Sequence, residues 1–150
     1  MPVTIGRHEH KLDAKNRLAI PSRYREALIA EKGTHFTLAV GIDECISLFL
    51  PSQWESYLNT LNEGIKSSKN KSTARALKRY IYRTAAEAPV DTQGRILIPP
   101  DLKSHAQLKK DVVISGAGDK AEIWDQKRWQ EYDRKQAAPS FKKLARDLDI

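Results

Sequence analysis

One short segment occurs twice in this sequence, and the repeat limits the folds that are possible more than any other feature. Residues 13–21 read Asp-Ala-Lys-Asn-Arg-Leu-Ala-Ile-Pro, and residues 91–99 read Asp-Thr-Gln-Gly-Arg-Ile-Leu-Ile-Pro. The shared pattern is D-x-x-x-R, then apolar residues of a short strand, then a proline. A repeat at a spacing of 78 residues predicts that the chain contains two copies of one structural unit.

Residues further along the chain repeat in the same order. Trp54 and Tyr57 recur 75 residues later as Trp129 and Tyr132. The 150 residues therefore divide into two halves that are each too small to bury much surface alone, which favours close packing of the halves or oligomerisation. We predict a first half at 7–53, connecting helices at 54–84, a second half at 85–128 and a C-terminal helix or tail at 129–150.

Each half is predicted to be mainly β with short helices, an α+β fold. Strands at 7–12 and 17–20 flank a turn, in which Asn16 occupies the place that Gly94 has in the second copy; both residue types tolerate a positive φ. Short helices follow at 23–29, with Ser22 as N-cap, and at 101–107. Each half then ends in a pair of strands. These strands are expected at 36–40, 45–50, 112–115 and 121–124.

Two longer helices are expected between the halves. Ser52-x-x-Glu55 has the form of a capping box, and apolar residues follow it at helical spacing to Ile65. A polar segment at 66–71 separates this helix from a second one at about 72–86. The tail from Asp133 is polar with a weak apolar stripe, typical either of a short helix that docks on a neighbour or of a mobile end.

The composition favours an anionic partner and excludes several other classes. Lys and Arg number 26 against 19 Asp and Glu, a net charge of +7 with a pI near 9.5, which favours nucleic acid but is weak evidence alone. Cys45 is the single cysteine, so we expect a buried apolar role and neither a disulfide nor a thiolate zinc site. No signal peptide and no bilayer-spanning stretch is apparent, so we expect a cytosolic protein.

The D-x-x-x-R segment can have either of two roles. In a tight turn the Asp can hold the Arg guanidinium and accept turn amides, which prepares the Arg for bidentate contact with phosphate or guanine. The alternative is a structural ion pair that only fixes the turn. The surroundings favour the first copy as the DNA contact, since it has more basic residues than the second. These neighbours of the first copy are Lys11, Lys15, Arg17, Arg23 and Arg25.

The two segments Leu12–Pro21 and Val90–Pro99 resemble the paired D-x-x-x-R signatures of the MraZ family, within the wider AbrB-like group of DNA-binding proteins. The likeness covers nearly the whole chain. It departs at Asn16, where the family usually has Gly, and at Pro99-Pro100.

This resemblance implies tandem SpoVT-AbrB-like halves that form a swapped-hairpin β-barrel with flanking helices. It also implies a transcriptional regulator that represses its own operon, the division and cell-wall gene cluster. Such a regulator binds short G-rich direct repeats of double-stranded DNA as a ring-shaped homo-oligomer associated with the nucleoid. The DNA-binding positions expected from the resemblance and the charge pattern are Asp13, Lys15, Arg17, Lys11, Arg23, Gln93 and Arg95.

Other patterns have weaker interpretations. Residues 66–83 carry seven cations and no acid, with Arg75, Arg79 and Arg83 at helical spacing; this stripe is either a phosphate-tracking helix or a solvated face. His8 and His10 share a strand face but lack further ligands at metal-binding spacing. No catalytic motif, cofactor site, small-molecule site or membrane segment is expected, and the tryptophans fit a core better than a base-stacking surface.

Two alternatives of other classes stay open. An antitoxin-like interaction module of AbrB-type fold would carry an acidic arm, but the tail at 133–150 has more Lys and Arg than Asp and Glu. A single-strand or RNA binder would need exposed aromatic platforms, which the sequence does not indicate.

Overall fold

The computed structural model describes residues 3–150. A strand, a turn, a short strand, a short helix and a two-stranded hairpin occur in this order twice. In the first half these elements are β1 (Arg7–Lys11), β2 (Arg17–Ala19), α1 (Ser22–Ala30), β3 (His35–Val40) and β4 (Ile46–Phe49). In the second half they are β5 (Ala86–Pro89), β6 (Arg95–Leu97), α4 (Pro100–Ala106), β7 (Asp111–Gly116) and β8 (Ala121–Asp125).

The two halves exchange their first strands. Six strands form an antiparallel sheet in the order β1-β7-β8-β4-β3-β5. Strand β1 of the first half pairs with β7 of the second, and β5 of the second half pairs with β3 of the first. At the centre Ser47 of β4 lies opposite Glu122 of β8, and these are equivalent positions of the two copies. The order of equivalent strands is therefore the same from either edge of the sheet, as in a swapped-hairpin dimer fused into one chain.

Strands β2 and β6 pair separately, as a two-stranded antiparallel sheet. Leu18 faces Ile96 across this pair, and both side chains are fully buried. They belong to one apolar cluster with residues from both halves, including Ile20, Ile98 and Leu102. Within residues 3–150 the hydrogen-bond ladders thus form two sheets on a shared core rather than one closed ring, and the fold is α+β.

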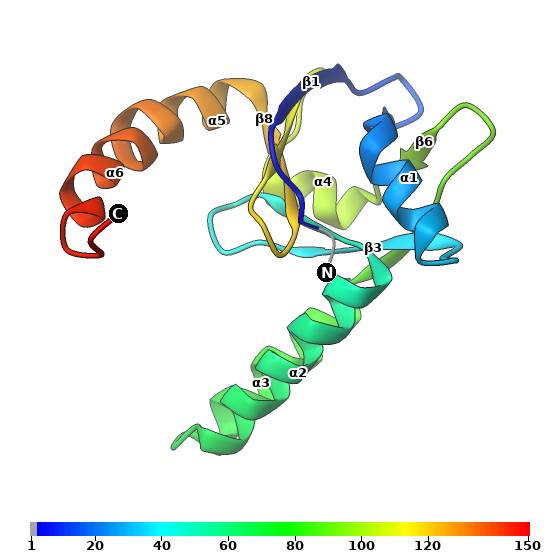
Figure 1. Cartoon of the computed structure of the whole chain (residues 1–150). Helices are drawn as coiled ribbons and strands as arrows, with labels where there is room; N and C mark the ends of the chain where they lie inside the picture. Colours follow the sequence, from blue (N-terminus) through cyan, green and yellow to red (C-terminus); the bar gives the residue numbers. More distant parts are fainter. Residues whose placement is uncertain (1–2) are drawn as a thin grey trace.

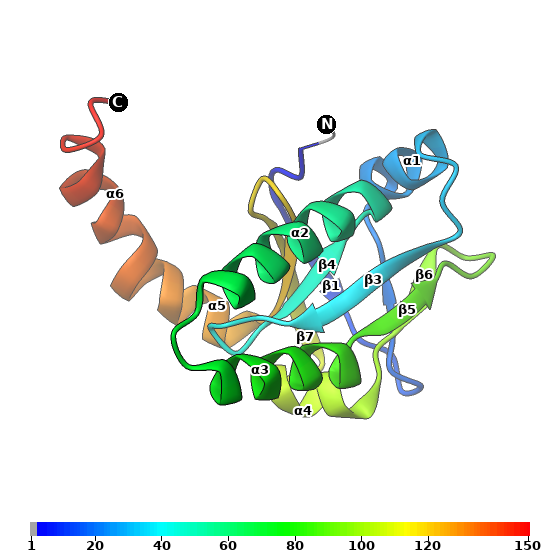
Figure 2. The same cartoon turned by 90° about the horizontal axis from the view of Figure 1, so that it is seen from below.

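Helices α2 (Pro51–Ser67) and α3 (Lys71–Thr84) connect the halves as a helical hairpin that projects from the sheet (Figures 1 and 2). The expected capping box of Ser52 is wrong. The helix begins at Pro51 with Leu50 as its N-cap, two residues earlier than expected, and the side chain of Gln53 accepts the backbone N–H of Leu50 at 3.0 Å. Ser52 instead donates its amide and its hydroxyl to the carboxylate of Glu31 at 2.9 and 2.6 Å.

The N-terminus of α1 also differs from expectation, and the N-terminus of α3 has a cap that the sequence analysis did not name. Ser22 is the first residue of α1 rather than its cap; Pro21 precedes it, and no side chain caps this end. Helix α3 is capped by Asn70, whose side chain accepts the amide of Thr73. At α3 several Ser, Thr and Asn residues lie close together in the sequence, and Asn70 is the one that caps the helix.

The tail is a helical arm that leaves the body at the end of β8 (Figure 1). It consists of α5 (Gln126–Tyr132), a π-helical turn η1 (Asp133–Ala137) and α6 (Ala138–Ala145). The apolar stripe of Phe141, Leu144 and Leu148 is exposed along it. No helix within residues 3–150 combines the length and the apolar character needed to cross a bilayer.

Candidate nucleic-acid interface

The first D-x-x-x-R segment is a turn organised by one carboxylate. Asp13 Oδ1 accepts the backbone N–H groups of Lys15 and Arg17 at 2.9 and 2.8 Å, and its Oδ2 accepts Arg17 Nε at 2.9 Å. The backbone of Asp13 also bonds Asn16 and Arg17, each at 3.0 Å. Asn16 adopts a φ of 61°, the left-handed conformation expected for this position. The turn geometry therefore follows from Asp and Asn at these two places.

The second segment builds the same turn. Asp91 Oδ1 accepts the amides of Gln93 and Arg95 at 2.8 and 2.9 Å, and Oδ2 lies 3.3 Å from Arg95 Nε. Gly94 has a φ of 78°, so Asn16 and Gly94 fill equivalent backbone positions as the sequence predicted.

The hydrogen bonds keep both turn carboxylates ionised. The pKa of Asp13 lies below its usual value because the Arg17 amide, the Arg17 guanidinium and the Lys15 amide donate to it, and they outweigh its partial desolvation. The pKa of Asp91 is lowered in the same way, chiefly by the Arg95 amide. Each Asp therefore presents a charged acceptor at neutral pH, and each Arg is held by a charge-assisted hydrogen bond.

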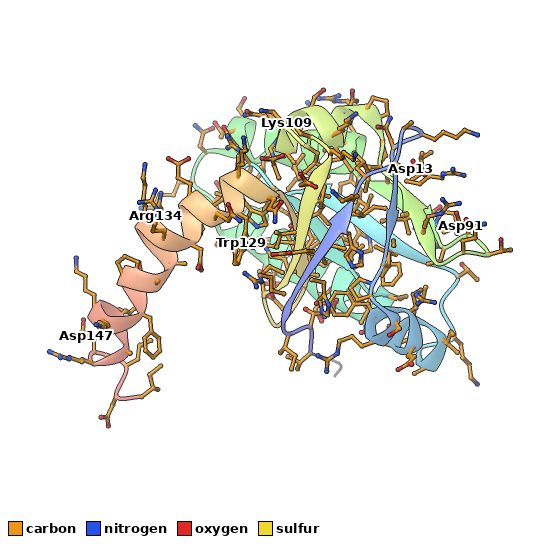
Figure 3. All side chains as sticks on the ribbon, turned by 90° about the horizontal axis from the view of Figure 1, so that it is seen from above. Asp13, Asp91, Lys109, Trp129, Arg134 and Asp147 are labelled. Atoms are coloured by element: carbon orange, nitrogen blue, oxygen red, sulfur yellow. The ribbon has the colours of Figure 1, made fainter. Side chains whose placement is uncertain are left out.

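The pairing of β2 with β6 places the two turns side by side. Ile20 donates its amide to the Gly94 carbonyl at 3.0 Å, and Ile98 donates to the Asn16 carbonyl at 2.8 Å. These bonds are equivalent under the repeat. Figure 3 shows Asp13 and Asp91 together at one end of the molecule, with the tail residues Arg134 and Asp147 at the other.

The two arginines are used unequally. Arg95 donates Nε to Asp91 and also Nη1 to Asp13 Oδ2, at 3.4 Å. Arg17 donates Nε to Asp13, and within residues 3–150 its Nη1 and Nη2 have no hydrogen-bond partner. Asp13 therefore holds both guanidiniums, and Arg17 keeps both terminal nitrogens for an external acceptor.

Each turn also receives a cation from the helix of the other half. Lys103 of α4 donates Nζ to Asn16 Oδ1 at 2.8 Å. Arg25 of α1 donates Nε to the Ile20 carbonyl at 3.0 Å, and its guanidinium lies about 3.1 Å from where a Cβ on Gly94 would be. Strand exchange thus places Lys103 at the first turn and Arg25 at the second.

Sequence reasoning counted Arg25 among the cations of the first copy and did not consider Lys103 at the first turn, and so missed this crossing. One available signal was that both follow the strand-ending proline by four residues, as Pro21 to Arg25 and as Pro99 to Lys103. The charge difference between the turns is consequently smaller in space than along the chain.

The structure brings together Asp13, Lys15, Arg17, Gln93 and Arg95 at this end of the molecule. Two other predicted positions have different surroundings. Lys11 pairs with Asp111 of the neighbouring β7 at 3.1 Å. Arg23 is exposed on α1, and it makes no hydrogen bond to either turn.

The basic stripe of α3 lies away from the turns. Ala74, Ile81 and Thr84 form the buried side of the helix, while Arg75 and Arg79 are exposed. The helical hairpin extends from the body in a different direction from the two turns (Figure 1).

The histidines have separate partners and do not gather. His8 packs edge-on against Tyr24, His35 pairs with Glu87 at 3.0 Å, and His105 bonds the Gly41 carbonyl at 2.9 Å. Burial, together with the neighbouring His8, lowers the pKa of His10. The described part of the chain holds no cluster of three or more His, Cys, Asp or Glu residues suited to a metal.

Cys45 and Trp124 lie in the interior, as predicted. Cys45 is fully buried, and burial beside Glu122 raises the pKa of its thiol to about 12. Trp124 is buried against Tyr132. Trp54 and Trp129 are half-buried, the first stacked on Tyr57 and the second beneath the guanidinium of Arg7.

Comparison with known proteins adds independent support. A family described as "MraZ protein, putative antitoxin-like" matches residues 4–80 and again 81–150. The chain is 41% identical over 145 residues to a transcriptional regulator MraZ of Heliobacterium modesticaldum, covering 96% of this chain and 95% of the relative. It is 40% identical over 144 residues to the protein of that name from Lactiplantibacillus plantarum, covering 96% of each.

Proposed function

The chain belongs to the MraZ family, and on that premise we propose that it is a transcriptional regulator that binds duplex DNA through the end formed by its two D-x-x-x-R turns. The relatives named above carry the name of transcriptional regulator. We propose that Asp13, Lys15, Arg17, Gln93 and Arg95 form the DNA-contacting surface.

The observation that carries the proposal is the state of Arg17. Its Nε is fixed by an ionised Asp13, and its two terminal nitrogens are left for another acceptor. A guanidinium held in this way loses little side-chain entropy when it binds, and its paired N–H groups match either a phosphate or the O6 and N7 atoms of guanine. A purely structural ion pair would not require the guanidinium to keep that pair of donors.

The second turn helps to hold the first turn in place through Arg95. Arg95 donates Nη1 to Asp13, so it helps to hold the first turn while its other terminal nitrogen, Nη2, keeps both of its N–H groups for another acceptor. We therefore assign the main base contact to Arg17, with Lys15 beside it, and a lesser contact to Gln93 and Arg95.

The finer parts of the proposal come from the family resemblance. We propose that the protein recognises short G-rich direct repeats upstream of its own gene, in a division and cell-wall gene cluster, and represses that operon. We also propose that it acts as a ring-shaped homo-oligomer on the nucleoid. Repeated DNA sites suit a ring, since successive subunits can present the same Arg17 surface to successive repeats.

The basic charge supports a DNA partner. With a net charge of +7, the affinity should fall steeply with salt, the slope of log K against log[salt] being about −0.9 per phosphate contacted.

Footprinting on the upstream region together with native mass spectrometry would identify the operator and the ring size.

The direct test of the site is Arg17→Ala. Loss of a bidentate base contact costs about 1–3 kcal/mol of discrimination, so specific binding should fall towards the level seen with unrelated DNA. A mobility-shift titration on the upstream DNA, with a scrambled duplex of equal length, measures both affinities.

Arg146→Ala is the matched control, because it removes an exposed arginine of the tail and leaves the turns intact. Circular dichroism of both variants checks the fold. If Arg17→Ala bound the upstream DNA as tightly as the wild type, the assignment of the site would be wrong.

The antitoxin-like alternative predicts a different use of the tail. Residues 133–150 form a helical arm with Lys135, Lys142, Lys143 and Arg146 on its surface, which is unlike an acidic arm that wraps a partner. The DNA-binding proposal therefore accounts for more of the structure.

A further inference from the structure

We propose that Lys103 is a DNA phosphate contact of the first turn, although it is encoded in the second half of the chain. This inference rests on the proposed function, because it concerns the same DNA-binding surface. It would make that surface a composite to which both halves contribute cations.

The first ground is the position of the Lys103 ammonium. Its Nζ lies 2.8 Å from Asn16 Oδ1, and Asn16 stands between Lys15 and Arg17 at the tip of the turn. An ammonium has three donors. Asn16 uses one, and within residues 3–150 the other two have no partner.

The second ground is that, among residues 3–150, no carboxylate forms an ion pair with this lysine. The acceptor of Lys103 is a neutral amide, whereas the neighbouring turn arginines donate to Asp13 and Asp91. Lys103 therefore adds a full positive charge to the first turn. A cation held at a fixed place beside Arg17 is suited to a phosphate, which positions the protein on the duplex while Arg17 contacts a base.

The third ground is the repeat itself. Arg25, the counterpart of Lys103 in the first half, lies against the second turn at Gly94. The crossed placement of a cation thus occurs at both turns, despite different residues and different local contacts. We infer that strand exchange creates this surface and that Arg25 has the corresponding place at the second turn.

The side chain of residue 16 distinguishes a phosphate contact from a structural role. Asn16→Gly keeps the positive φ and removes the oxygen that Lys103 bonds. If Lys103 served only to hold Asn16, its replacement would have no further effect once that oxygen was gone. A phosphate contact would still be lost in the Asn16→Gly background.

The experiment is a cycle of wild type, Lys103→Met, Asn16→Gly and the double variant, each titrated with upstream and scrambled duplexes at several salt concentrations. We expect Lys103→Met to weaken binding to both duplexes by a similar factor and to reduce the salt slope by about 0.9. The same reduction should appear in the Asn16→Gly background. Arg17→Ala, in contrast, should mainly reduce the preference for the upstream duplex.

Lys109→Met is the matched control. Lys109 is an exposed lysine between α4 and β7, and Figure 3 shows it apart from Asp13. Thermal unfolding of every variant shows whether the fold is retained.

An unchanged salt slope in Lys103→Met overturns the inference, and so does an effect that disappears in the Asn16→Gly background or equals that of Lys109→Met. Those results would leave the proposed function standing, provided that the wild type prefers the upstream duplex and Arg17→Ala loses that preference. Failure of the wild type to bind duplex DNA would instead overturn the proposed function and this inference with it.

Discussion

At the scale of the residue, two aspartates determine the candidate site. Asp13 and Asp91 each accept two backbone amides and the guanidinium of the arginine in their own turn, and Asp13 also accepts Nη1 of Arg95. An Asp at the start of a turn commonly accepts amides from the next residues, but here the same carboxylate also fixes the arginine. One residue thus sets both the backbone path and the direction of the functional side chain.

The lowered pKa values predict how stability depends on acidity. The pKa of each aspartate falls below the ordinary 3.8 when the chain folds, so the stabilisation is fully present above about pH 4. It is lost as the pH falls through the folded pKa. We therefore expect the melting temperature of the wild type to drop below pH 4 more steeply than that of the Asp13→Asn/Asp91→Asn double variant. Thermal scans from pH 7 to pH 3 measure this, and parallel curves for the two proteins would contradict it.

At the scale of the element, the strand pair β2–β6 connects the turns to the core. Leu18 and Ile96 are fully buried on one side of the pair, and the adjacent Leu97 is 59% exposed on the other. The alternation follows from the period of two along a strand. The turns are therefore held by a small two-stranded sheet whose inner face belongs to the common core.

This alternation predicts unequal effects of neighbouring truncations. Ile96→Ala should lower the free energy of unfolding by about 2–5 kcal/mol, because it leaves a cavity in the core. Leu97→Ala removes the exposed neighbour and should change it by less than about 0.5 kcal/mol. Urea unfolding of both variants gives the two values, and equal effects would show that the inner face is not as described.

Much of this level of structure could be predicted from the sequence, because its causes are local. The repeat, the strands, the short helices and the equivalence of Asn16 with Gly94 depend on neighbouring residues, and the structure agrees. The helix caps at Ser22 and Ser52 were predicted wrongly. At Ser52 the tertiary partner Glu31 accepts both the amide and the hydroxyl, and local sequence carries no record of that contact.

The candidate DNA-binding site could likewise be predicted only where its contacts are local. Asp13 with Arg17, and Asp91 with Arg95, follow from spacing. The contact of Lys103 with Asn16 and the bond of Arg95 to Asp13 depend on which strands pair between the halves, and a single sequence does not state that pairing.

At the scale of the whole molecule, the exchange of strands makes the halves interdependent. Neither half completes the sheet with its own first strand. The apolar cluster likewise mixes residues of both halves. The molecule is therefore one structural unit with a shared sheet and a shared core, although its sequence has two copies.

We predict that residues 1–68 expressed alone form no stable monomer, because β1 and β2 lack their partners in the other half. If the fragment folds, it should do so only as a dimer that exchanges β1 between two copies. Circular dichroism with analytical ultracentrifugation tests this, using the full chain as the control. A monomeric fragment with a cooperative unfolding transition would show that the halves are independent.

The strand exchange also has a consequence for folding during synthesis. The end of β1 at Lys11 pairs with Asp111, 100 residues later in the chain. The first strand therefore leaves the ribosome long before its partner exists, and its backbone groups stay unpaired until almost the whole chain has been made. Contacts this distant along the chain slow folding. During that interval the nascent β1 must not pair with strands of other molecules. Its charged and polar sequence, Arg-His-Glu-His-Lys, suits this requirement, because charged side chains on an unpaired strand oppose aggregation.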